Sequence, residues 1–334
     1  MSALVQRRER DGRERPESDR GWPAYARTTL AVSLVLLLSS CAPPRSGRIV
    51  IGAKNFTEQV ILGELLAQEI EAVSAAEGRP EAVERRFYLA GSYVCHQALV
   101  AGRIDAYVEY TGTALTAILK QPLPPLGERT AERVFARVAQ LYRTRYGIEV
   151  EPSLGFEDTF AIVVRADDAR RLGLTTVSQL TQRIDDAASG ANLPHAWRLG
   201  VGYEFESRPD GLSGLSAAYG LHLAVPPRTM DLGLLYRALA AGQVDVVAGN
   251  STDGPIRALS LAVLADDRHY FPPYEAVPLV RGDALAAHPA IGRALSRLAG
   301  RFTAAEVQAM NDAVDGQHLD PADVVRDLRR RKGL

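Results

Sequence analysis

The sequence predicts an α/β fold of two similar lobes that face a shared cleft. From residue 48 onward, short apolar segments of strand length alternate with amphipathic helical patterns, as in layered α/β folds. In addition, residues 98–113 (ALVAGRIDAYVEYTGT) align without a gap with residues 238–253 (ALAAGQVDVVAGNSTD), which indicates an internal repeat. The length of 334 residues is sufficient for about two domains, each with its own core.

The first 41 residues are predicted to be a signal peptide rather than part of the fold. Arginines precede an apolar core that is too short to span a bilayer as a mature helix. The core ends in residues 38–41 (LSSC), which resemble a bacterial lipobox and imply cleavage before Cys41 and lipid on that cysteine. An ordinary signal peptide with an incidental cysteine is the alternative. Residues 42–47 would then form a short tether, and Cys95 would have no partner for an intramolecular disulfide.

The folded part begins with a strand pattern at residues 48–52, followed by an amphipathic helix that begins near Thr57. Lys54 lies in the turn between them, at the carboxyl end of the strand, where α/β folds bind ligands. Asn55 with Glu58 fits a capping box for this helix, and Thr57 itself is the alternative cap.

The first copy of the repeat contains a helix, a glycine and a strand. The helix is expected to end at Val100, and Gly102 suits its C-terminal cap. We expect a strand at residues 104–108 and a loop at residues 109–113 (EYTGT) that faces the cleft.

The second copy has the same order of elements. Asp245 takes the place of Asp105, and Asn250 takes the place of Tyr110. Because the shared pattern Ala-Gly-x-apolar-Asp contains little information, coincidence is the alternative explanation. Two lobes that each present one such loop to the cleft explain the repeat simply.

The rest of the chain supplies the remaining elements of the two lobes. Helices are predicted at residues 130–146, 176–190 and 289–334, strands at residues 161–164 and 198–203, and a polar turn at residues 204–211. Extended stretches at residues 155–164 and 272–281 are predicted to cross between the lobes. Lobe 1 would therefore contain residues 48–157 and 272–334, and lobe 2 would contain residues 158–271.

Composition excludes several kinds of function. The net charge is −1, so nothing indicates a nucleic-acid partner. The six histidines show no metal-ligand spacing, and the sequence has no Gly-rich phosphate-binding loop. We therefore expect no metal, no cofactor and no ATP hydrolysis by this chain.

Six ordered segments carry a resemblance to a known family: GAKNFTEQ, GSYVCHQALVAGRIDAYVEYTGT, LGFEDTFAIVVR, FESRPDG, NSTDG and DDRHYFPPYEAVPLVR. From about residue 49 to the end, the chain resembles the substrate-binding proteins of osmoprotectant ABC importers, which bind glycine betaine, choline, carnitine and related quaternary amines. The resemblance implies a type II-like, two-lobe periplasmic binding protein rather than an enzyme. It further implies a receptor in the periplasm or on the cell surface, held to the membrane by its lipid and partnered by an ABC permease and its ATPase.

The resemblance also assigns an aromatic cage. A quaternary ammonium has no N–H to donate and cannot lose its charge, so proteins hold it against aromatic faces. The corresponding cage residues here are Tyr110, Phe160 and Tyr274, and Asp158 is expected to contribute through its backbone beside them. At a fourth position, where the family commonly has tyrosine, this chain has Asn250.

The exchange at Asn250 leaves two possibilities for the ligand. Loss of one cage face would weaken binding of a desolvated cation by roughly 0.5–2 kcal/mol, or about tenfold. Alternatively, the same receptor fold binds an altered ligand, such as an ergothioneine-like betaine or an amino-acid derivative, that can use the hydrogen bonds of an amide.

A carboxylate on the ligand would need cations or N–H donors. The resemblance assigns this role to Lys54, Thr113 and Arg208, although the last could also be part of a capped surface turn. A competing hypothesis is an enzyme on the same two-lobe scaffold, with Glu109 or Glu204 as the general acid.

Overall fold

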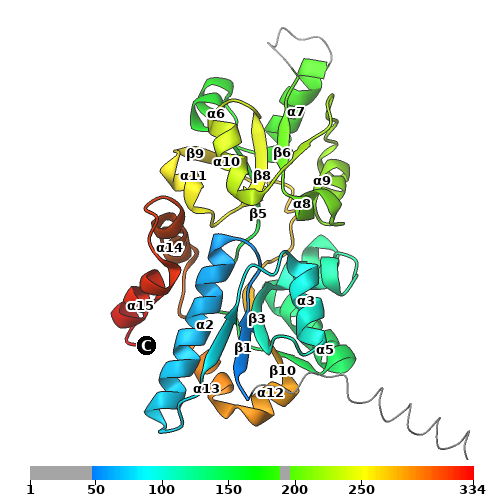
Figure 1. Cartoon of the computed structure of the whole chain (residues 1–334). Helices are drawn as coiled ribbons and strands as arrows, with labels where there is room; N and C mark the ends of the chain where they lie inside the picture. The colour runs from blue at the N-terminus through cyan, green and yellow to red at the C-terminus, as the bar shows by residue number, and fades with distance from the viewer. Residues whose placement is uncertain (1–46, 189–195) are drawn as a thin grey trace, which may run out of the picture. The chain divides into compact units, whose positions relative to one another are not determined.

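A computed structural model of the protein describes residues 47–188 and 196–334, and Figure 1 shows how its elements are arranged. The predicted signal peptide, the lipidation site Cys41 and the predicted tether, apart from Gly47, lie outside the described residues. Within the described ranges, no helix is long and apolar enough to cross a membrane.

Ten strands of the described residues form two mixed sheets. The first sheet consists of β1 (Ile49–Gly52), β2 (Val83–Arg86), β3 (Ala106–Tyr110), β4 (Ile148–Val150) and β10 (Ala276–Arg281). The second sheet consists of β5 (Phe160–Arg165), β6 (Leu199–Val201), β7 (Arg228–Thr229), β8 (Val246–Asn250) and β9 (Leu261–Leu264).

The two sheets have the same topology. The strand orders are β2-β1-β3-β10-β4 and β7-β6-β8-β5-β9. In the first sheet β1 is parallel to β2 and β3, and β10 is antiparallel to β3 and β4. In the second sheet β6 is parallel to β7 and β8, and β5 is antiparallel to β8 and β9. The protein is therefore an α/β protein built from two equivalent halves.

The structure confirms the internal repeat, because its two copies lead into the equivalent central strands β3 and β8. The Asp105 carboxylate accepts a hydrogen bond from the backbone N–H of Val50 at 2.9 Å. The Asp245 carboxylate accepts the equivalent bond from the backbone N–H of Arg198 at 3.0 Å. In each half, the repeated aspartate thus ties its own strand to the start of the neighbouring strand.

Helices cover the sheets. They are α2 (Thr57–Ala76), α3 (Ser92–Val100), α4 (Thr111–Thr113), which continues into the π-helical turn η1 (Ala114–Ile118), the 3₁₀ turn η2 (Leu126–Glu128), α5 (Ala131–Tyr146), α6 (Ala166–Leu172), α7 (Val177–Ala188), α8 (Tyr203–Ser207), α9 (Leu212–Tyr219), α10 (Leu232–Ala240), α11 (Gly254–Ala258), α12 (Gly282–Ala287), α13 (Pro289–Leu298), α14 (Ala304–Asp315) and α15 (Pro321–Lys332).

Both faces of the first sheet are buried, as in α/β folds generally. Ile49 and Ile51 of β1 enter one core cluster together with Ile61 of α2. Val50 between them enters the cluster on the other face, together with Leu99 of α3. This alternation is the two-residue period of a strand, and it explains why the apolar run at the start of the fold is continuous.

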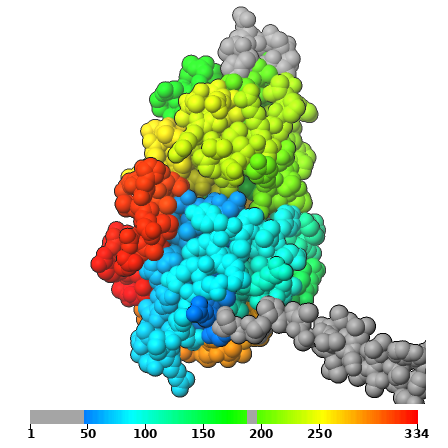
Figure 2. Space-filling model, in the orientation of Figure 1, coloured from blue at the N-terminus to red at the C-terminus, as the bar shows by residue number. Residues whose placement is uncertain are grey.

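The C-terminal helices link the two halves. Helices α14 and α15 contact α2, and α14 also contacts α11, which follows a strand of the second sheet. Figure 2 shows them, in red tones, along the side of the molecule against the blue and yellow segments. The end of the chain therefore bridges the two halves beside α2.

The chain passes between the sheets after β4 and again after β9. These connections, residues 151–159 and 265–275, lie side by side, because Glu157 and Glu275 form an antiparallel bridge. The lobe boundaries given above remain a prediction.

Three predicted boundaries are wrong. The strand expected at residues 104–108 ends at Tyr110, so Glu109 and Tyr110 belong to the strand and not to a loop. The strand expected at residues 198–203 ends at Val201. The polar turn expected from residue 204 onward begins instead with the short helix α8. At the end of β3, the ion pair with Lys54 neutralises the charge of Glu109, which would otherwise be unfavourable in this buried position.

The predicted caps of α2 are also wrong. The residue at the N-cap is Phe56, and no side chain caps the helix. The Thr57 hydroxyl donates instead to the Asp315 carboxylate of α14. The Glu58 carboxylate turns into the protein interior, where it accepts hydrogen bonds from residues of three other segments.

Candidate ligand-binding site

A cavity of about 450 Å³ lies between segments of the two halves, within the size range of small-molecule sites. The lining combines the ends of the equivalent strands β3 and β8 with the start of β5 and the connection before β10. All eight residues that the resemblance assigned to the ligand line it: Lys54, Tyr110, Thr113, Asp158, Phe160, Arg208, Asn250 and Tyr274.

Aromatic rings form much of the cavity wall. Phe160 lies 5.8 Å from Tyr274 and 4.8 Å from Phe205, measured between ring centroids, and both contacts are edge-to-face. Tyr110 contributes a further ring from the end of β3. Phe56, Tyr203 and Phe205 also line the cavity and were not predicted from the sequence. Phe205 stands in the segment FESRPDG, whose helix α8 has only five residues, too few to show a helical period.

The hydroxyl groups of Tyr110 and Tyr274 donate to buried carboxyl groups. The Tyr110 hydroxyl donates to Glu58 and accepts a hydrogen bond from the Gln59 side chain at 3.0 Å. The Tyr274 hydroxyl donates to Asp210 at 2.6 Å. Burial raises the pKa of both tyrosines well above the usual value, and the neighbouring carboxylates raise it further, so both phenols stay protonated.

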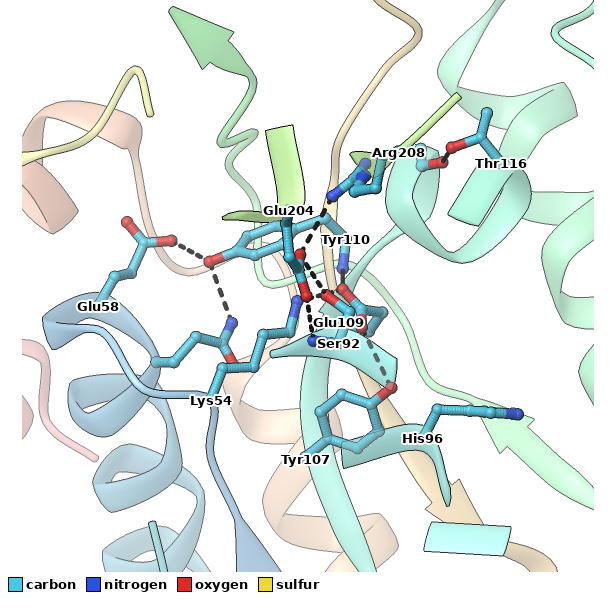
Figure 3. Close-up of polar contacts among 12 residues, drawn as sticks. Lys54, Glu58, Ser92, His96, Tyr107, Glu109, Tyr110, Thr116, Glu204 and Arg208 are labelled. Carbon is cyan, nitrogen blue, oxygen red and sulfur yellow. Dashed lines mark hydrogen bonds and ion pairs between the residues drawn. The ribbon is translucent and has the colours of Figure 1, made fainter. Parts of the chain in front are cut away.

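Lys54 is buried and already has a protein partner. Its ammonium group forms an ion pair with Glu109 and lies 4.7 Å from the centroid of the Tyr110 ring, as Figure 3 shows. Glu109 also accepts the Tyr107 hydroxyl at 3.1 Å and the Tyr110 backbone N–H at 2.8 Å. Glu109 is fully buried and is not part of the cavity lining. These contacts give it a structural role and leave it no position as a general acid toward a ligand.

Arg208 is buried as well, so it is not part of a surface turn. Its guanidinium forms two hydrogen bonds with Asp210, at 3.0 and 2.6 Å, and lies 4.7 Å from the centroid of the Phe160 ring. Burial by itself would raise the pKa of Asp210, but the Arg208 charge and the hydrogen bonds lower it below the usual value. Asp210 is therefore ionised at neutral pH.

Glu204 joins the two halves across the cavity. From α8 its carboxylate accepts hydrogen bonds from the Ser92 backbone N–H and, at 3.1 Å, from the Ser92 hydroxyl at the N-terminus of α3. An anion is favoured at this end of a helix. A Cβ atom on Gly91 would lie 2.0 Å from Glu204 Oε1, so this contact requires glycine at position 91. The carboxylate is occupied by this contact and by Arg208, 3.5 Å away, rather than free for acid catalysis.

A second connection between the halves runs through Thr252, in the loop after β8. The Thr252 hydroxyl donates to Glu58, and its carbonyl accepts the Asn311 side chain of α14 at 2.9 Å. The Thr252 backbone N–H donates to Asp158 at 3.3 Å. Burial raises the pKa of Glu58, and it raises that of Asp158 well above its usual value. Sequence reasoning missed Glu58 because its pattern fits a helix cap.

Asn250 ends β8, where Tyr110 ends β3. Its backbone N–H donates to Asp253 at 2.9 Å, and its amide nitrogen lies 3.5 Å from the other oxygen of the same carboxylate. The half-buried amide replaces an aromatic face with a polar group in the cavity wall.

The charges around the cavity favour a cationic ligand. Among the described residues, the charged side chains of the lining are Lys54, Asp158, Glu204, Arg208 and Asp231. Each of the two cations is neutralised by a buried carboxylate behind the wall, Glu109 or Asp210. Of the three acidic side chains that remain, Asp158 has a pKa that burial raises well above its usual value, so Glu204 and Asp231 are the negative charges of the lining. The described residues contain no group of three or more His, Cys, Asp or Glu side chains that could hold a metal ion.

Comparison with known proteins places this chain among solute receptors. Residues 47–330 match the family described as the substrate-binding domain of ABC-type glycine betaine transport systems. The chain is 31% identical over 314 residues to the carnitine transport binding protein OpuCC of Listeria monocytogenes, which covers 91% of this chain and 94% of that protein. The match to the ergothioneine transport permease/ergothioneine binding protein EgtU of Helicobacter pylori is 29% identical and covers 92% of this chain and 53% of that protein.

A solved structure described as a glycine betaine/carnitine/choline ABC transporter has the same fold. It superimposes with a TM-score of 0.68 at 30% identity and covers 85% of this chain and 98% of its own. The expected α/β fold of a periplasmic substrate-binding protein is therefore confirmed. The matched relatives are solute-binding proteins of transporters, so the hypothesis of an enzyme is set aside.

Proposed function

Because the chain belongs to the family of substrate-binding domains of ABC-type glycine betaine transport systems, we propose that its cavity binds a quaternary-ammonium osmoprotectant such as glycine betaine or choline. The observation that carries this proposal is the aromatic cage, defined as Tyr110, Phe160 and Tyr274, in a cavity whose cations are already neutralised. Such a site attracts a permanent cation through ring faces and a surplus of carboxylates. A cage without these carboxylates would serve neutral ligands equally well.

The carboxylate of a betaine would meet Lys54, Thr113 and Arg208. The ammonium group of Lys54 has three N–H donors and forms an ion pair with Glu109, so donors remain for a ligand. The guanidinium of Arg208 donates to Asp210 from Nε and Nη2. Its Nη1 lies 3.5 Å from Glu204 and remains as a donor for a ligand. Both cations can thus keep their internal partners and still bind an anionic end.

We also infer that the solute stabilises a closed arrangement of two lobes with the boundaries predicted above. Both halves supply cavity residues, and the contacts of Glu204 with Ser92 and of Thr252 with Glu58 hold the halves together around the cavity. A ligand that touches both halves binds the closed state better than the open one and therefore shifts the population toward it.

The cellular context follows from the family. Substrate-binding proteins of ABC importers act outside the cytoplasm, and the proposed partners are an ABC permease and its ATPase. The residues at 38–41 (LSSC) support a lipid on Cys41 that would hold the receptor to a membrane.

Isothermal titration calorimetry tests this function. The chain from Ser46 onward would be titrated with glycine betaine, choline, carnitine, proline betaine, ergothioneine and ordinary amino acids. We expect micromolar binding of a quaternary amine, lost in Tyr110→Ala and kept in Tyr146→Ala, which removes a ring outside the cavity lining. Absence of binding by every quaternary amine in the unaltered protein would refute the proposal.

A second candidate ligand is favoured by Asn250. The half-buried amide suits a solute with a hydrogen-bonding group beside its cationic head, such as an ergothioneine-like betaine, and one relative is named for ergothioneine. The variant Asn250→Tyr separates the two candidates. A rise in affinity for glycine betaine or choline of up to about tenfold would support an osmoprotectant cage that lacks one wall. A loss of ergothioneine binding without that rise would support the second candidate.

A further inference from the structure

The cage contains two tyrosines whose hydroxyl groups turn to buried carboxyl groups outside the cavity. Tyr110 donates to Glu58 and Tyr274 donates to Asp210, while neither carboxylate belongs to the cavity lining. Resting on the function proposed above, we propose that Glu58 and Asp210 are positioning residues that set the selectivity of this site for a cation over a neutral ligand of the same shape, by acting through the rings of Tyr110 and Tyr274.

The physical basis is polarisation of the phenol. When a phenol donates its hydrogen bond to a carboxylate, the O–H bond is polarised and electron density moves from the oxygen toward the ring. The face of the ring becomes more negative, and a cation on that face is held more strongly. A neutral ligand of the same shape gains little, because it contacts the ring mainly through dispersion.

The Tyr110 hydroxyl lies between a donor and an acceptor. The Gln59 amide nitrogen donates to it at 3.0 Å, and the hydroxyl donates to Glu58. The burial that raises the pKa of Tyr110 keeps the hydroxyl proton on the phenol. Tyr110 is therefore a neutral donor with an electron-rich ring.

The Tyr274 pair is anchored in the same manner from the other side of the cage. Asp210 is held by two hydrogen bonds from Arg208, and the Tyr274 hydroxyl meets the same carboxylate oxygen as Arg208 Nη2. Asp210 is ionised, because the Arg208 charge and the hydrogen bonds outweigh the effect of burial on its pKa, so the Tyr274 hydroxyl donates to an anion whose charge Arg208 partly offsets.

The protein itself places a cation beside the Tyr110 ring. The Lys54 ammonium lies 4.7 Å from the centroid of Tyr110. This contact shows that a face of the ring is accessible to positive charge within the cavity wall.

The test compares each cation with its carbon isostere, in which a quaternary carbon replaces the quaternary nitrogen. Calorimetry would give the affinities of glycine betaine and of choline, each beside its isostere, for the unaltered chain, Tyr110→Phe and Tyr274→Phe. These substitutions keep the ring and remove only the hydroxyl that faces the carboxylate. Tyr219→Phe is the matched control, because its hydroxyl donates to Asp266 and the residue is not part of the cavity lining.

We expect the ratio of cation to isostere affinity to fall by about twofold to tenfold in Tyr110→Phe and in Tyr274→Phe, and not at all in Tyr219→Phe. Glu58→Gln should lower the ratio in the unaltered chain and have no further effect on it in Tyr110→Phe. An unchanged ratio in Tyr110→Phe, or a parallel loss of both ligands, would overturn this inference alone, because it would mean that the hydroxyl only supports the structure. Failure of the unaltered chain to bind either cation would refute the proposed function and this inference with it.

Discussion

Several carboxyl groups around the cavity are buried, and burial changes their pKa. Asp253, beside Asn250, accepts hydrogen bonds from the Tyr236 hydroxyl at 2.6 Å and from the Asn250 backbone. Burial raises its pKa from 3.8 to about 6. An ionised group that is removed from water costs free energy unless it is fully compensated, and hydrogen bonds from neutral donors compensate this one only in part.

This shift predicts an unusual pH dependence of stability. Between pH 3.8 and about 6 the folded protein holds a proton on Asp253 that the unfolded chain has lost, so this residue makes the free energy of unfolding fall as the pH rises. The contribution amounts to about 3 kcal/mol over the window. Asp253→Asn should therefore gain stability relative to the unaltered protein between pH 4 and about 6, measured by urea denaturation at a series of pH values.

The control for this prediction is Asp267→Asn. Although slight burial would raise the pKa of Asp267, hydrogen bonds from Ser178 lower it, so its stabilising contribution is lost only at lower pH and has the opposite sign. Identical pH profiles for Asp253→Asn and the unaltered protein would contradict the assignment.

At the scale of single residues, the sequence predicted which side chains line the cavity but not which of them form hydrogen bonds with buried carboxyl groups. The resemblance placed all eight assigned residues, including Phe160 and Asn250, in one cavity wall. It did not reveal that Glu58 meets Tyr110 or that Asp210 meets Tyr274, because these partners are 52 and 64 positions apart and meet only in the folded chain. Local spacing at Glu58 even indicated a helix cap, which a buried hydrogen-bond network overrides.

Among the structural elements, α3 carries the contact that closes the cavity from the side of the first sheet. Its first residue, Ser92, binds Glu204 of α8, and Gly91 before it has φ −93°, a backbone conformation that alanine also adopts. Gly91→Ala would therefore leave α3 intact and displace Glu204, whose Oε1 lies 2.0 Å from the position of the new Cβ.

We expect Gly91→Ala to weaken solute binding by about tenfold, because the closed state loses a charge-assisted hydrogen bond. Calorimetry measures the affinity, and thermal unfolding should show little change in the stability of the free protein. Gly127→Ala, whose Cβ would meet open space, should bind normally. Full affinity in Gly91→Ala would show that this contact does not contribute to closure.

Helices and strands were predictable where the apolar pattern of the sequence continues over several periods. The helix expected at residues 130–146 is α5, with Thr130 as its cap, and its apolar stripe spans several turns. The end of β3 was misplaced because Glu109 looks like a loop residue until Lys54 is placed beside it. The five residues of α8 are too few to show a helical period, and the following Pro209 indicates a turn.

For the molecule as a whole, the repeat explains why one cavity receives equivalent strand ends from both halves. Strands β3 and β8 occupy equivalent places in their sheets, so Tyr110 and Asn250 reach the cavity from equivalent positions. One half supplies a polarised ring and the other an amide. A pseudo-symmetric scaffold thus presents a chemically asymmetric site, which suits a solute with a cationic head and a different second end.

The contacts that join the halves predict that the two halves unfold in one transition and that a bound solute stabilises both. Glu204 with Ser92, Thr252 with Glu58, and α14 against α11 all join the halves, so a solute bound between them should stabilise both. A ligand at a hundred times its Kd adds about 2.7 kcal/mol to the free energy of unfolding. For a chain of this size we therefore expect a single transition in scanning calorimetry that rises by roughly 5–10 °C with saturating solute. The same rise in Tyr110→Ala would show that the solute binds elsewhere, and a shift in only one of two resolved transitions would show that the halves do not close around it.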